Sequence, residues 1–470
     1  MPLILGTNSI KDTGYDVANS LRFDDGSSDY LSKTFASAGN TKKWTWSCWF
    51  KKSDIPATWT SLIEAGVSGS QYFSLGIDGS ERLILASQDE GAGGVMNLWS
   101  SQLIRDISAW YHFVVAYDSA QATSSDRVKG YINGEQITSF NTANYPAQNK
   151  VTYLNGNYEH RIGRRITGQV YNGYMAEVCL IDGTALDATS FGEFDEDTGI
   201  WKPIDVSGLT FGTNGFYLDF ENSGSLGTDV SGNGNNFTVN NLTSIDQSTD
   251  TCTNNFATGN PIASQAGSAQ SNSLLTFSEG NLLMADNSET GIANFGLSSG
   301  KWFWEVKVIA DQDGLIIGAC NEHFNINAEL GYNSPASATG AKAFGYYGGN
   351  GTATVSVDDG SGFGSYGSAI AVNNIVSVAL DLDSADQSCT FYLNGSSQGA
   401  LDITNLSSGE SYFPAVGNWS ASDVSTSWNF GSPQYSESGG NSDGNGYGNF
   451  SMAVPSGYYA LNTKNLAEYG

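Results

Sequence analysis

Apolar side chains recur along most of this chain with a period of two, the spacing of a β-strand. The pattern is clearest from Trp110 to Tyr117, where both sets of alternate positions are largely apolar, as in a strand that is buried on both faces. After a polar loop, a second strand is predicted from Val128 to Ile132. Asn133-Gly134 then predicts a tight hairpin turn, because both residues tolerate a positive φ.

The same order of strand, polar loop and hairpin recurs from Val376 to Gly399, with a second Asn-Gly turn at Asn394-Gly395. Because the two stretches share both the alternation and the turn chemistry, we expect one architecture to be used twice. The rest of the chain reads as short strands separated by Gly, Asp and Ser turns, the signal of a β-sandwich.

Composition supports an almost wholly β protein. Of the 470 residues, 57 are Gly, 12% are aromatic and only 14% are charged, and no window sustains a helical period. We expect two tandem β-sandwich domains with little helix. The expected divisions are an N-terminal arm (1–20), a first sandwich with a strand-and-turn coda (21–250), a linker (251–272), a second sandwich (273–435) and a Gly/Asn-rich tail (436–470).

The charge balance excludes several classes of partner. The formal net charge is −28, and residues 203–470 hold four Lys and no Arg. Phosphate backbones and anionic lipid surfaces repel such a molecule, so we expect no nucleic-acid binding. No apolar stretch approaches the roughly 20 residues of a membrane span, so no membrane insertion is expected.

The five cysteines are scattered singly and predict neither a metal site nor a disulfide framework. The first residues lack the charged start and apolar core of a secretory signal peptide. We therefore expect a protein that is made in a host cytoplasm.

Residues 21–186 resemble the laminin-G-like, concanavalin A-like jelly-roll family. The matching segments, in chain order, are Leu21–Tyr30, Trp44–Phe50, Trp110–Asp118, Gly130–Glu135 and Gly173–Leu186. The resemblance implies a jelly-roll fold for the first domain. It does not by itself imply a function.

Residues 299–433 resemble the SPRY domain family, another bent β-sandwich. The resemblance rests on Ser299–Val308, Gly314–Cys320, Val376–Gly395, Ser411–Gly417 and Trp428–Pro433. The loops at 336–341 and 348–367 depart from the family in being rich in Gly, Ser and Ala, which leaves any binding surface on those loops in doubt.

Two further segments, Tyr447–Leu466 and Gly227–Asn236, are similar to segments of virion surface proteins of marine tailed phages, cyanophages among them. This resemblance implies a non-enzymatic structural protein of the virion, either a tail-fibre component or a capsid decoration. Its implied partners are other virion proteins, further copies of the same chain in a homo-oligomer, and a glycan or protein on the host surface.

Candidate catalytic groups are few. His112 lies in a buried-looking strand and is expected to be structural, while His160, among three arginines, is expected on a solvated edge. Concanavalin A-like glycosidases need a pair of carboxylates, and the nearest run is the one that contains Glu193 and Asp195. That run lacks the final Glu of the E-x-D-x-x-E spacing. The alternative of a secreted carbohydrate-binding or polysaccharide-cleaving protein stays open.

Calcium is the one cofactor that the sequence raises. Asp229, Ser231 and Asn233, followed by Gly234, have the alternating oxygen pattern of a calcium loop. Asn240 stands where the bidentate Glu of such a loop belongs, so a polar turn is the competing interpretation.

Exposed aromatic rings stack on sugars, and several aromatic residues lie in or near predicted loops. The candidate ligand-binding residues are Trp59, Trp99, Tyr346, Tyr347 and Trp419. Most other Trp residues fall at alternating strand positions and are expected in the core.

Overall fold

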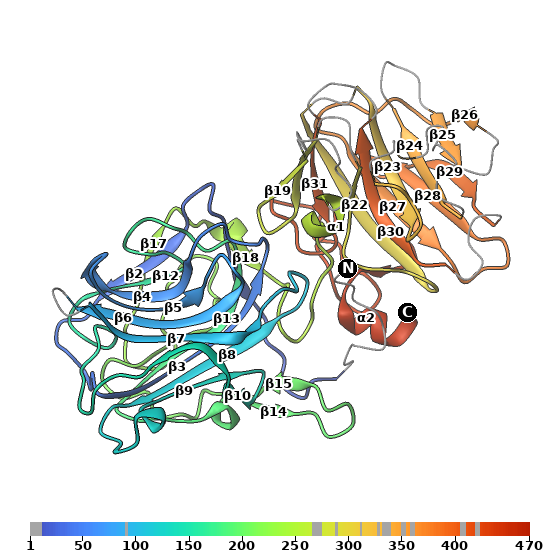
Figure 1. Ribbon diagram of the computed structural model, residues 1–470. Helices are drawn as coiled ribbons and strands as arrows, with labels where there is room; N and C mark the ends of the chain where they lie inside the picture. Colours follow the sequence, from blue (N-terminus) through green and yellow to red (C-terminus); the bar gives the residue numbers. More distant parts are fainter. Residues whose placement is uncertain are drawn as a thin grey trace. The chain divides into compact units, whose positions relative to one another are not determined.

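Figure 1 shows the computed structural model of the chain, in which β-sheets dominate. The structure describes residues 12–89, 93–265, 275–286, 290–310, 313–326, 330, 340–348, 354–357, 362–404, 410–418 and 424–470. Among these residues only two short α-helices occur, α1 (Pro261–Gln265) and α2 (Thr463–Tyr469), which confirms the all-β class. No helix of the described chain is long and apolar enough to cross a membrane.

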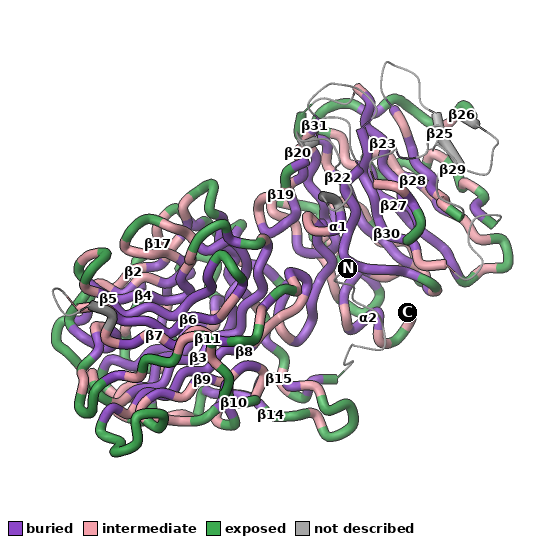
Figure 2. Tube along the Cα trace, in the orientation of Figure 1, coloured by how far each residue is buried: buried purple, intermediate pink, exposed green. Residues whose placement is uncertain are grey.

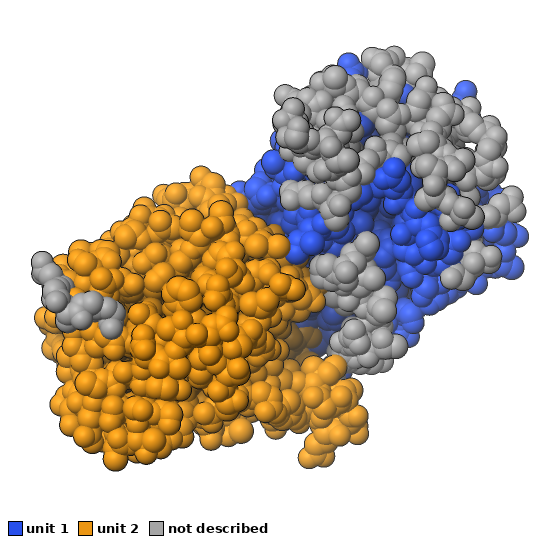
Figure 3. Space-filling view, viewed as in Figure 1, with its two compact units in different colours: residues 1–12, 254–470 blue, residues 13–253 orange. Residues whose placement is uncertain are grey.

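The chain divides into two compact units (Figure 3). The N-terminal unit is Thr13–Thr253, coloured orange, and the described part of Asn254–Gly470 forms the C-terminal unit, coloured blue. Each unit contains its own pair of large sheets and its own core.

The N-terminal unit is a sandwich of two eight-stranded sheets. Sheet 1 contains β1 (Ser20–Phe23), β3 (Lys43–Lys52), β8 (Tyr111–Asp118), β9 (Val128–Ile132), β10 (Glu135–Gln136), β13 (Gly173–Asp182), β16 (Phe216–Leu218) and β18 (Gln247–Ser248). Sheet 2 contains β2 (Tyr30–Thr34), β4 (Thr60–Ser68), β5 (Gln71–Ile77), β6 (Arg82–Asp89), β7 (Gly93–Leu103), β11 (Phe140–Asn144), β12 (Glu159–Ile162) and β17 (Thr238–Asn240). The strand orders are β10-β9-β8-β3-β13-β1-β18, with β16 on β13, and β11-β7-β6-β5-β4-β12-β2-β17.

The core of this unit lies between the two sheets, and much of the chain in their strands is coloured as buried in Figure 2. Alternate residues of β3 project into it, so that Trp44 and Trp46 are fully buried. Trp44 packs edge-on against Phe73 of sheet 2 at 5.1 Å. The outer face of sheet 1 is covered in turn by a second apolar cluster that includes Trp201 of the small hairpin β14 (Gly192–Phe194) and β15 (Trp201–Pro203). Three 3-10 turns, η2 (Ser124–Asp126), η3 (Ala188–Ser190) and η4 (Ser244–Asp246), complete the unit.

The coda predicted for the first domain is part of this sandwich, because β16, β17 and β18 pair with β13, β2 and β1. Two buried ion pairs hold its last residues. Arg22 lies 3.1 Å from Asp246, and Lys51 lies 2.8 Å from Asp250. Because a buried charge is costly without its partner, these pairs fix the path of the chain after β17.

The C-terminal unit also contains two large sheets. Sheet 3 contains β19 (Thr276–Ser278), β20 (Leu283–Asp286), β22 (Lys301–Ala310), β27 (Ile375–Asp381), β28 (Ser388–Leu393), β29 (Ser396–Asp402), β31 (Val424–Asn429) and β32 (Tyr459–Ala460). Sheet 4 contains β21 (Thr290–Ile292), β23 (Leu315–Asn321), β24 (Ala343–Tyr347), β25 (Thr354–Val357), β26 (Gly362–Ser365) and β30 (Tyr412–Asn418). Their orders are β19-β20-β31-β22-β27-β28-β29, with β32 on β22, and β21-β30-β23-β24-β25-β26.

The repeated module predicted from the sequence is confirmed in both units. β8, β9 and β10 are consecutive neighbours in sheet 1, as β27, β28 and β29 are in sheet 3. The turn residues Asn133 and Gly134 have φ values of 47° and 83°, and Asn394 and Gly395 have 49° and 81°. Both hairpins therefore use the left-handed conformation that the Asn-Gly pairs predicted.

The C-terminal segment packs on the outer face of sheet 3. β32 runs parallel to β22, and Phe450 packs edge-on against Phe303 at 5.0 Å. The buried carboxylate of Glu305 accepts hydrogen bonds from the backbone N–H and the hydroxyl of Ser451, at 3.0 and 2.6 Å. Residues 436–470 are thus integrated into the C-terminal unit.

Candidate functional site

Three aromatic side chains gather on the face of sheet 2 that points away from the core. On β5 and β6, Phe73, Leu75, Leu83 and Leu85 face the core, so the alternating Tyr72, Ile84 and Ala86 lie on the other face. Trp59, which precedes β4, and Trp99 of β7 pack against them and stay partly exposed. We call Trp59, Tyr72 and Trp99, with the arginines described next, the aromatic-arginine cluster.

An arginine stacks on each tryptophan of this cluster. The guanidinium carbon of Arg165 lies 4.1 Å from the ring centroid of Trp59 and 5.5 Å from that of Tyr72. The guanidinium carbon of Arg82 lies 5.4 Å from the centroid of Trp99. Stacking of this kind fixes the plane of a guanidinium group while leaving its edge available for hydrogen bonds.

A carboxylate holds each arginine by its Nε side. The Nε–H of Arg165 donates to Oε2 of Glu64 at 3.1 Å, and the other oxygen of Glu64 accepts from the backbone N–H of Ile166 at 2.6 Å. Nε of Arg82 lies 3.2 Å from Oδ2 of Asp78. Among the described residues neither arginine has a hydrogen-bond acceptor for its terminal nitrogens, and the side chains of Arg82 and Arg165 are 22% and 12% exposed. Each arginine therefore presents a fork of donors of the kind that binds carboxylate or sulfate.

The two indoles also carry unused donors. Nε1 of Trp59 and Nε1 of Trp99 are shielded from water and have no hydrogen-bond acceptor in the part of the chain that the structure describes. A shielded donor without an acceptor is unfavourable, so both indoles carry an unrelieved cost in this structure.

A cluster of arginines is unusual in a chain with so negative a net charge. All the arginines lie in residues 1–202 of a protein whose net charge is −28. Beside the cluster, Arg164 stacks on Tyr30 at 4.8 Å, so the same sheet carries a third arginine on an aromatic ring. Arginine is thus concentrated on this face against the overall charge, with Glu64 and Asp78 balancing the charges of Arg165 and Arg82.

The structure brings together two of the five aromatic residues that the sequence proposed, Trp59 and Trp99. Trp99 lies within β7 instead of near a loop. The sequence did not single out Tyr72, Arg82 or Arg165. Tyr72 was visible as an aromatic at an alternating strand position, but pairing between β4, β5, β6 and β7 is what unites the residues.

The other three aromatic candidates lie elsewhere. Tyr346 was expected in or near a loop, as a ring that could bind a ligand, but it lies in β24, where it is fully buried against Tyr366 and Phe391. Its ring is therefore part of the core and is not accessible to a ligand. Tyr347 is half-buried at the end of the same strand. Trp419 lies outside the described residues.

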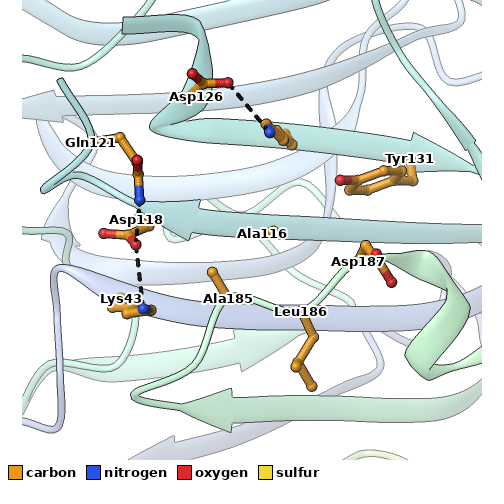
Figure 4. A pocket seen from close by; sticks show the side chains of 10 residues that line it. Lys43, Ala116, Asp118, Gln121, Asp126, Tyr131, Ala185, Leu186 and Asp187 are labelled. Carbon is orange, nitrogen blue, oxygen red and sulfur yellow. Dashed lines mark hydrogen bonds and ion pairs between the residues drawn. The ribbon is translucent and has the colours of Figure 1, made fainter. Parts of the chain in front are cut away.

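A polar groove of about 520 Å³ lies on the outer face of sheet 1 (Figure 4). Its charged side chains form pairs, with Nζ of Lys43 3.4 Å from Asp118 and Nζ of Lys129 3.3 Å from Asp126. The ring of Tyr131 forms part of its wall. The volume suits a small ligand, but each lysine is already paired with a carboxylate, so the groove has no excess of positive charge.

His112 is confirmed as a structural residue. Its ring is fully buried, and Nδ1 accepts a 3.0 Å hydrogen bond from the indole N–H of Trp201. Nε2 lies 2.8 Å from the hydroxyl of Ser47 and must carry the proton, because Nδ1 is the acceptor. This tautomer donates to Ser47 and cannot remove its proton. Burial lowers the pKa of His112 to about 3.

The expectation that His160 lies on a solvated edge is wrong. Its ring is fully buried, Nε2 accepts from the backbone N–H of Asn155, and Nδ1 pairs with the carbonyl of Tyr158. Its strand, β12, lies between β4 and β2, so the side chain faces the core while Arg161 faces outward. Burial lowers the pKa of His160 to about 4.

Glu193 and Asp195, the nearest match to a glycosidase pair, lie on the β14–β15 hairpin. Both approach the ammonium group of Lys202, at 3.5 and 3.3 Å. Hydrogen bonds from the side chain and backbone of Thr198 lower the pKa of Asp195. A general acid needs a raised pKa, so this carboxylate is poorly suited to protonate a leaving group.

The oxygens of the calcium candidates are engaged within a turn. Oδ1 of Asp229 accepts from the backbone N–H groups of Tyr217 and Ser231, and Oδ2 accepts from that of Asn235. The hydroxyl of Ser231 accepts from the N–H of Asn233, whose amide donates to two backbone carbonyls. No group of three or more His, Cys, Asp or Glu side chains suited to a metal ion occurs in the described chain.

Comparisons with known proteins give several similarities. The chain matches no curated protein sequence. Among solved structures, similar ones include the SPRY domain of human HERC1, with 13% identity over 31% of this chain and 87% of that one and a TM-score of 0.25. The TRIM65 PSpry domain is similar with 13% identity over 37% of this chain and 91% of that one, and with a TM-score of 0.28.

A heptameric SAP-like pentraxin from Limulus polyphemus is also similar, with 13% identity over 37% of this chain and 79% of that one and a TM-score of 0.28. By sequence, residues 25–189 match a laminin G family described as the concanavalin A-like lectin/glucanases superfamily. This stretch of the N-terminal unit is therefore similar to the concanavalin A-like superfamily.

Proposed function

We propose that this protein is a non-enzymatic adhesion protein that binds acidic glycans through the aromatic-arginine cluster of its N-terminal unit. The observation that carries the proposal is the stacking of Arg165 on Trp59 and of Arg82 on Trp99, with terminal guanidinium nitrogens that have no acceptor among the described residues. Sugars bind through ring faces and hydroxyl groups, and an acidic sugar adds a carboxylate or sulfate. The aromatic rings of the cluster can stack on the face of a sugar ring, and the guanidinium donors can bind its carboxylate or sulfate group.

The rigidity of the cluster supports this assignment. Glu64 is almost fully buried and fixes both Arg165 and the backbone at Ile166. Small side chains, Ser74 and Ala86, occupy the neighbouring outward positions of β5 and β6. A preorganised site loses less conformational entropy on binding.

The chemistry near the cluster favours binding over cleavage. Glycoside hydrolysis needs two carboxyl groups, one of them with a raised pKa. Glu64 is engaged by Arg165 and Ile166, and Asp78 accepts from the backbone N–H groups of Ser80 and Arg82. Both carboxylates hold the arginines in place, which is the role of a support for a binding site.

We further propose that the adhesion protein belongs to the virion of a tailed phage, as a fibre-like or capsid-decorating component. The support is the sequence resemblance of residues 227–236 and 447–466 to phage virion surface proteins. Several copies on one particle would multiply a weak contact between one glycan and one cluster.

Affinity electrophoresis tests the binding function. The purified full chain is run through native gels that contain acidic or neutral polysaccharides. We expect retardation by an acidic polysaccharide that weakens at high salt, because exposed charges are screened. Equal migration in all gels would contradict the proposal, and release of reducing sugar would contradict its non-enzymatic part.

Immunogold electron microscopy tests the location. Gold on the tail or head of intact particles is expected. Absence of gold on particles whose known coat protein is labelled would contradict the virion assignment and leave the glycan-binding proposal to stand on its own test.

A further inference from the structure

One buried ion pair in the N-terminal unit lacks the hydrogen bonds that such pairs normally make. Nζ of Lys52 lies 3.6 Å from Oε1 of Glu81, and the two side chains are 1% and 11% exposed. Both atoms are shielded from water, and neither has a hydrogen-bond partner among the described residues. A charge pair in this state bears the cost of desolvation without the compensating bonds.

The neighbouring lysine shows the usual arrangement. Lys51 is equally buried, but its Nζ donates a 2.8 Å hydrogen bond to Asp250, which also accepts from the indole N–H of Trp110 at 3.1 Å. The two adjacent lysines of β3, which lie on opposite faces of the sheet, thus differ in their bonding. Lys51 is hydrogen-bonded to its carboxylate, whereas Lys52 only lies against the carboxyl group of Glu81.

The surroundings of Lys52 favour a nucleophilic amine. Burial lowers the pKa of Lys52, which increases its neutral fraction. Burial also raises the pKa of Asp54, two residues after Lys52 in the sequence, to about 6. The Nε–H of Arg105 donates to Oε2 of Glu81 at 3.1 Å, where it can stabilise negative charge on that oxygen.

We propose that Lys52 and Glu81 join in an intramolecular isopeptide bond. The neutral amine of Lys52 attacks Cδ of Glu81, and Arg105 stabilises the oxygen that becomes negatively charged. The C–N bond forms, one C–O bond breaks, and the oxygen leaves as water after it takes up the two protons that the ammonium group of Lys52 gives up. One ammonium and one carboxylate thus become one amide and one water, with no oxidant or co-reactant.

The fold gives this bond both a driving force and a purpose. Condensation replaces two poorly solvated charges by a neutral amide, so burial favours the product. Lys52 ends β3 of sheet 1, and Glu81 lies in the turn between β5 and β6 of sheet 2. The bond would link the two sheets covalently in a chain whose five cysteines are all free thiols.

Mass spectrometry of the full chain tests the proposal. The protein is refolded from denaturant, kept at neutral pH and denatured again before measurement. We expect the intact mass to fall by one water as folding proceeds, and digestion to yield a branched peptide that joins the segment around Lys52 to that around Glu81. If the folded protein keeps the full mass calculated from its sequence, the bond does not form and the proposal is refuted.

Three controls separate this bond from other causes. K52R retains a buried cation but has no amine, so it should keep the full mass, while K51R should still lose water. Asp-Gly pairs such as Asp78-Gly79 also lose water when they form succinimides. Succinimides are cleaved by hydroxylamine, and the branched peptide is not. A water loss that persists in K52R or disappears with hydroxylamine would overturn the proposal.

Discussion

The indole N–H of Trp201 donates to Nδ1 of His112, and the two rings stack at 6.0 Å with an angle of 19°. The hydrogen bond and the burial keep His112 neutral in the folded protein, although an unfolded histidine takes up a proton below a pH of about 6.5. Between pH 6.5 and about 3 the unfolded state therefore binds the extra proton, and the folded state loses stability as the pH falls.

A pH series measures this effect. In the wild type, His112 should reduce the free energy of unfolding by about 1.4 kcal/mol for each pH unit below 6.5. His112→Gln lacks this contribution, so the difference between variant and wild type should shrink by that amount per unit between pH 6 and pH 4. Urea unfolding at each pH provides the values. A constant difference over this range would contradict the buried neutral imidazole.

Glu177 should respond to pH with the opposite sign. It is buried on β13 with a positive φ of 53°, and it accepts hydrogen bonds from the hydroxyls of Tyr217 and Tyr15. Burial raises its pKa to about 7, so the folded state binds a proton that the unfolded state has released above a pH of about 4.5. This contribution to stability is present at pH 5 and is lost as the pH rises through 7.

Glu177→Gln removes the titration but preserves the shape. Relative to the wild type, the variant should gain about 2–3 kcal/mol in free energy of unfolding between pH 5 and pH 8. Guanidinium unfolding of both proteins at the two values gives the comparison. The same variant-minus-wild-type difference at both pH values would show that Glu177 does not carry the shift.

The two Asn-Gly turns provide a matched pair of substitutions. A Cβ on Gly134 would lie 2.4 Å from the Trp201 ring, whereas a Cβ on Gly395 would meet only Met452, at 3.8 Å. Gly395→Ala should cost about 1–2 kcal/mol, from the left-handed backbone alone. Gly134→Ala should cost about 1–3 kcal/mol more, because it also displaces the indole. Equal costs in thermal unfolding would contradict the packing of Trp201 on this turn.

Calcium is expected to find no site at Asp229, because N–H groups occupy both carboxylate oxygens. Calorimetric titration of chelator-treated protein should show no saturable heat. Asp229→Ala should lower the free energy of unfolding by about 2–4 kcal/mol, since it removes an acceptor that is shared by several backbone donors. Saturable heat together with a higher melting temperature in calcium would contradict the polar-turn interpretation.

Hairpins were the most predictable part of the fold. Asn133-Gly134 and Asn394-Gly395 carry their turn type in two adjacent residues, and the strands beside them alternate cleanly. The conformation of such a turn can be predicted from its two residues, because it does not depend on contacts with distant parts of the chain. The position of His160 was mispredicted for the opposite reason. Its arginine neighbours indicated solvent, but in β12 alternate residues face opposite sides of the sheet.

The candidate site was predictable only in part. Trp59 and Trp99 could be chosen as aromatics, but their meeting depends on the register of four strands that a single sequence does not specify. Arg165 is 106 positions after Trp59 in the sequence, and only the turn after β12 places it on that ring. Tyr346 was a plausible ligand-binding residue in the sequence because it lies beside a glycine-rich loop. In the structure its strand directs the side chain into the core.

The central claim is that acidic glycan binds at the aromatic-arginine cluster, and calorimetry of one glycan in two forms tests it most directly. An acidic oligosaccharide and its carboxyl-reduced, neutral form are titrated into the wild type, Trp59→Ala and Phe194→Ala, the last of which alters an exposed aromatic on the β14–β15 hairpin. We expect the wild type and Phe194→Ala to bind the acidic form with the same affinity. Trp59→Ala should bind the acidic form at least about tenfold more weakly, which corresponds to a loss of about 1.4 kcal/mol in binding free energy. All three proteins should bind the neutral form weakly. Equal affinity of Trp59→Ala and the wild type for the acidic form would contradict the account.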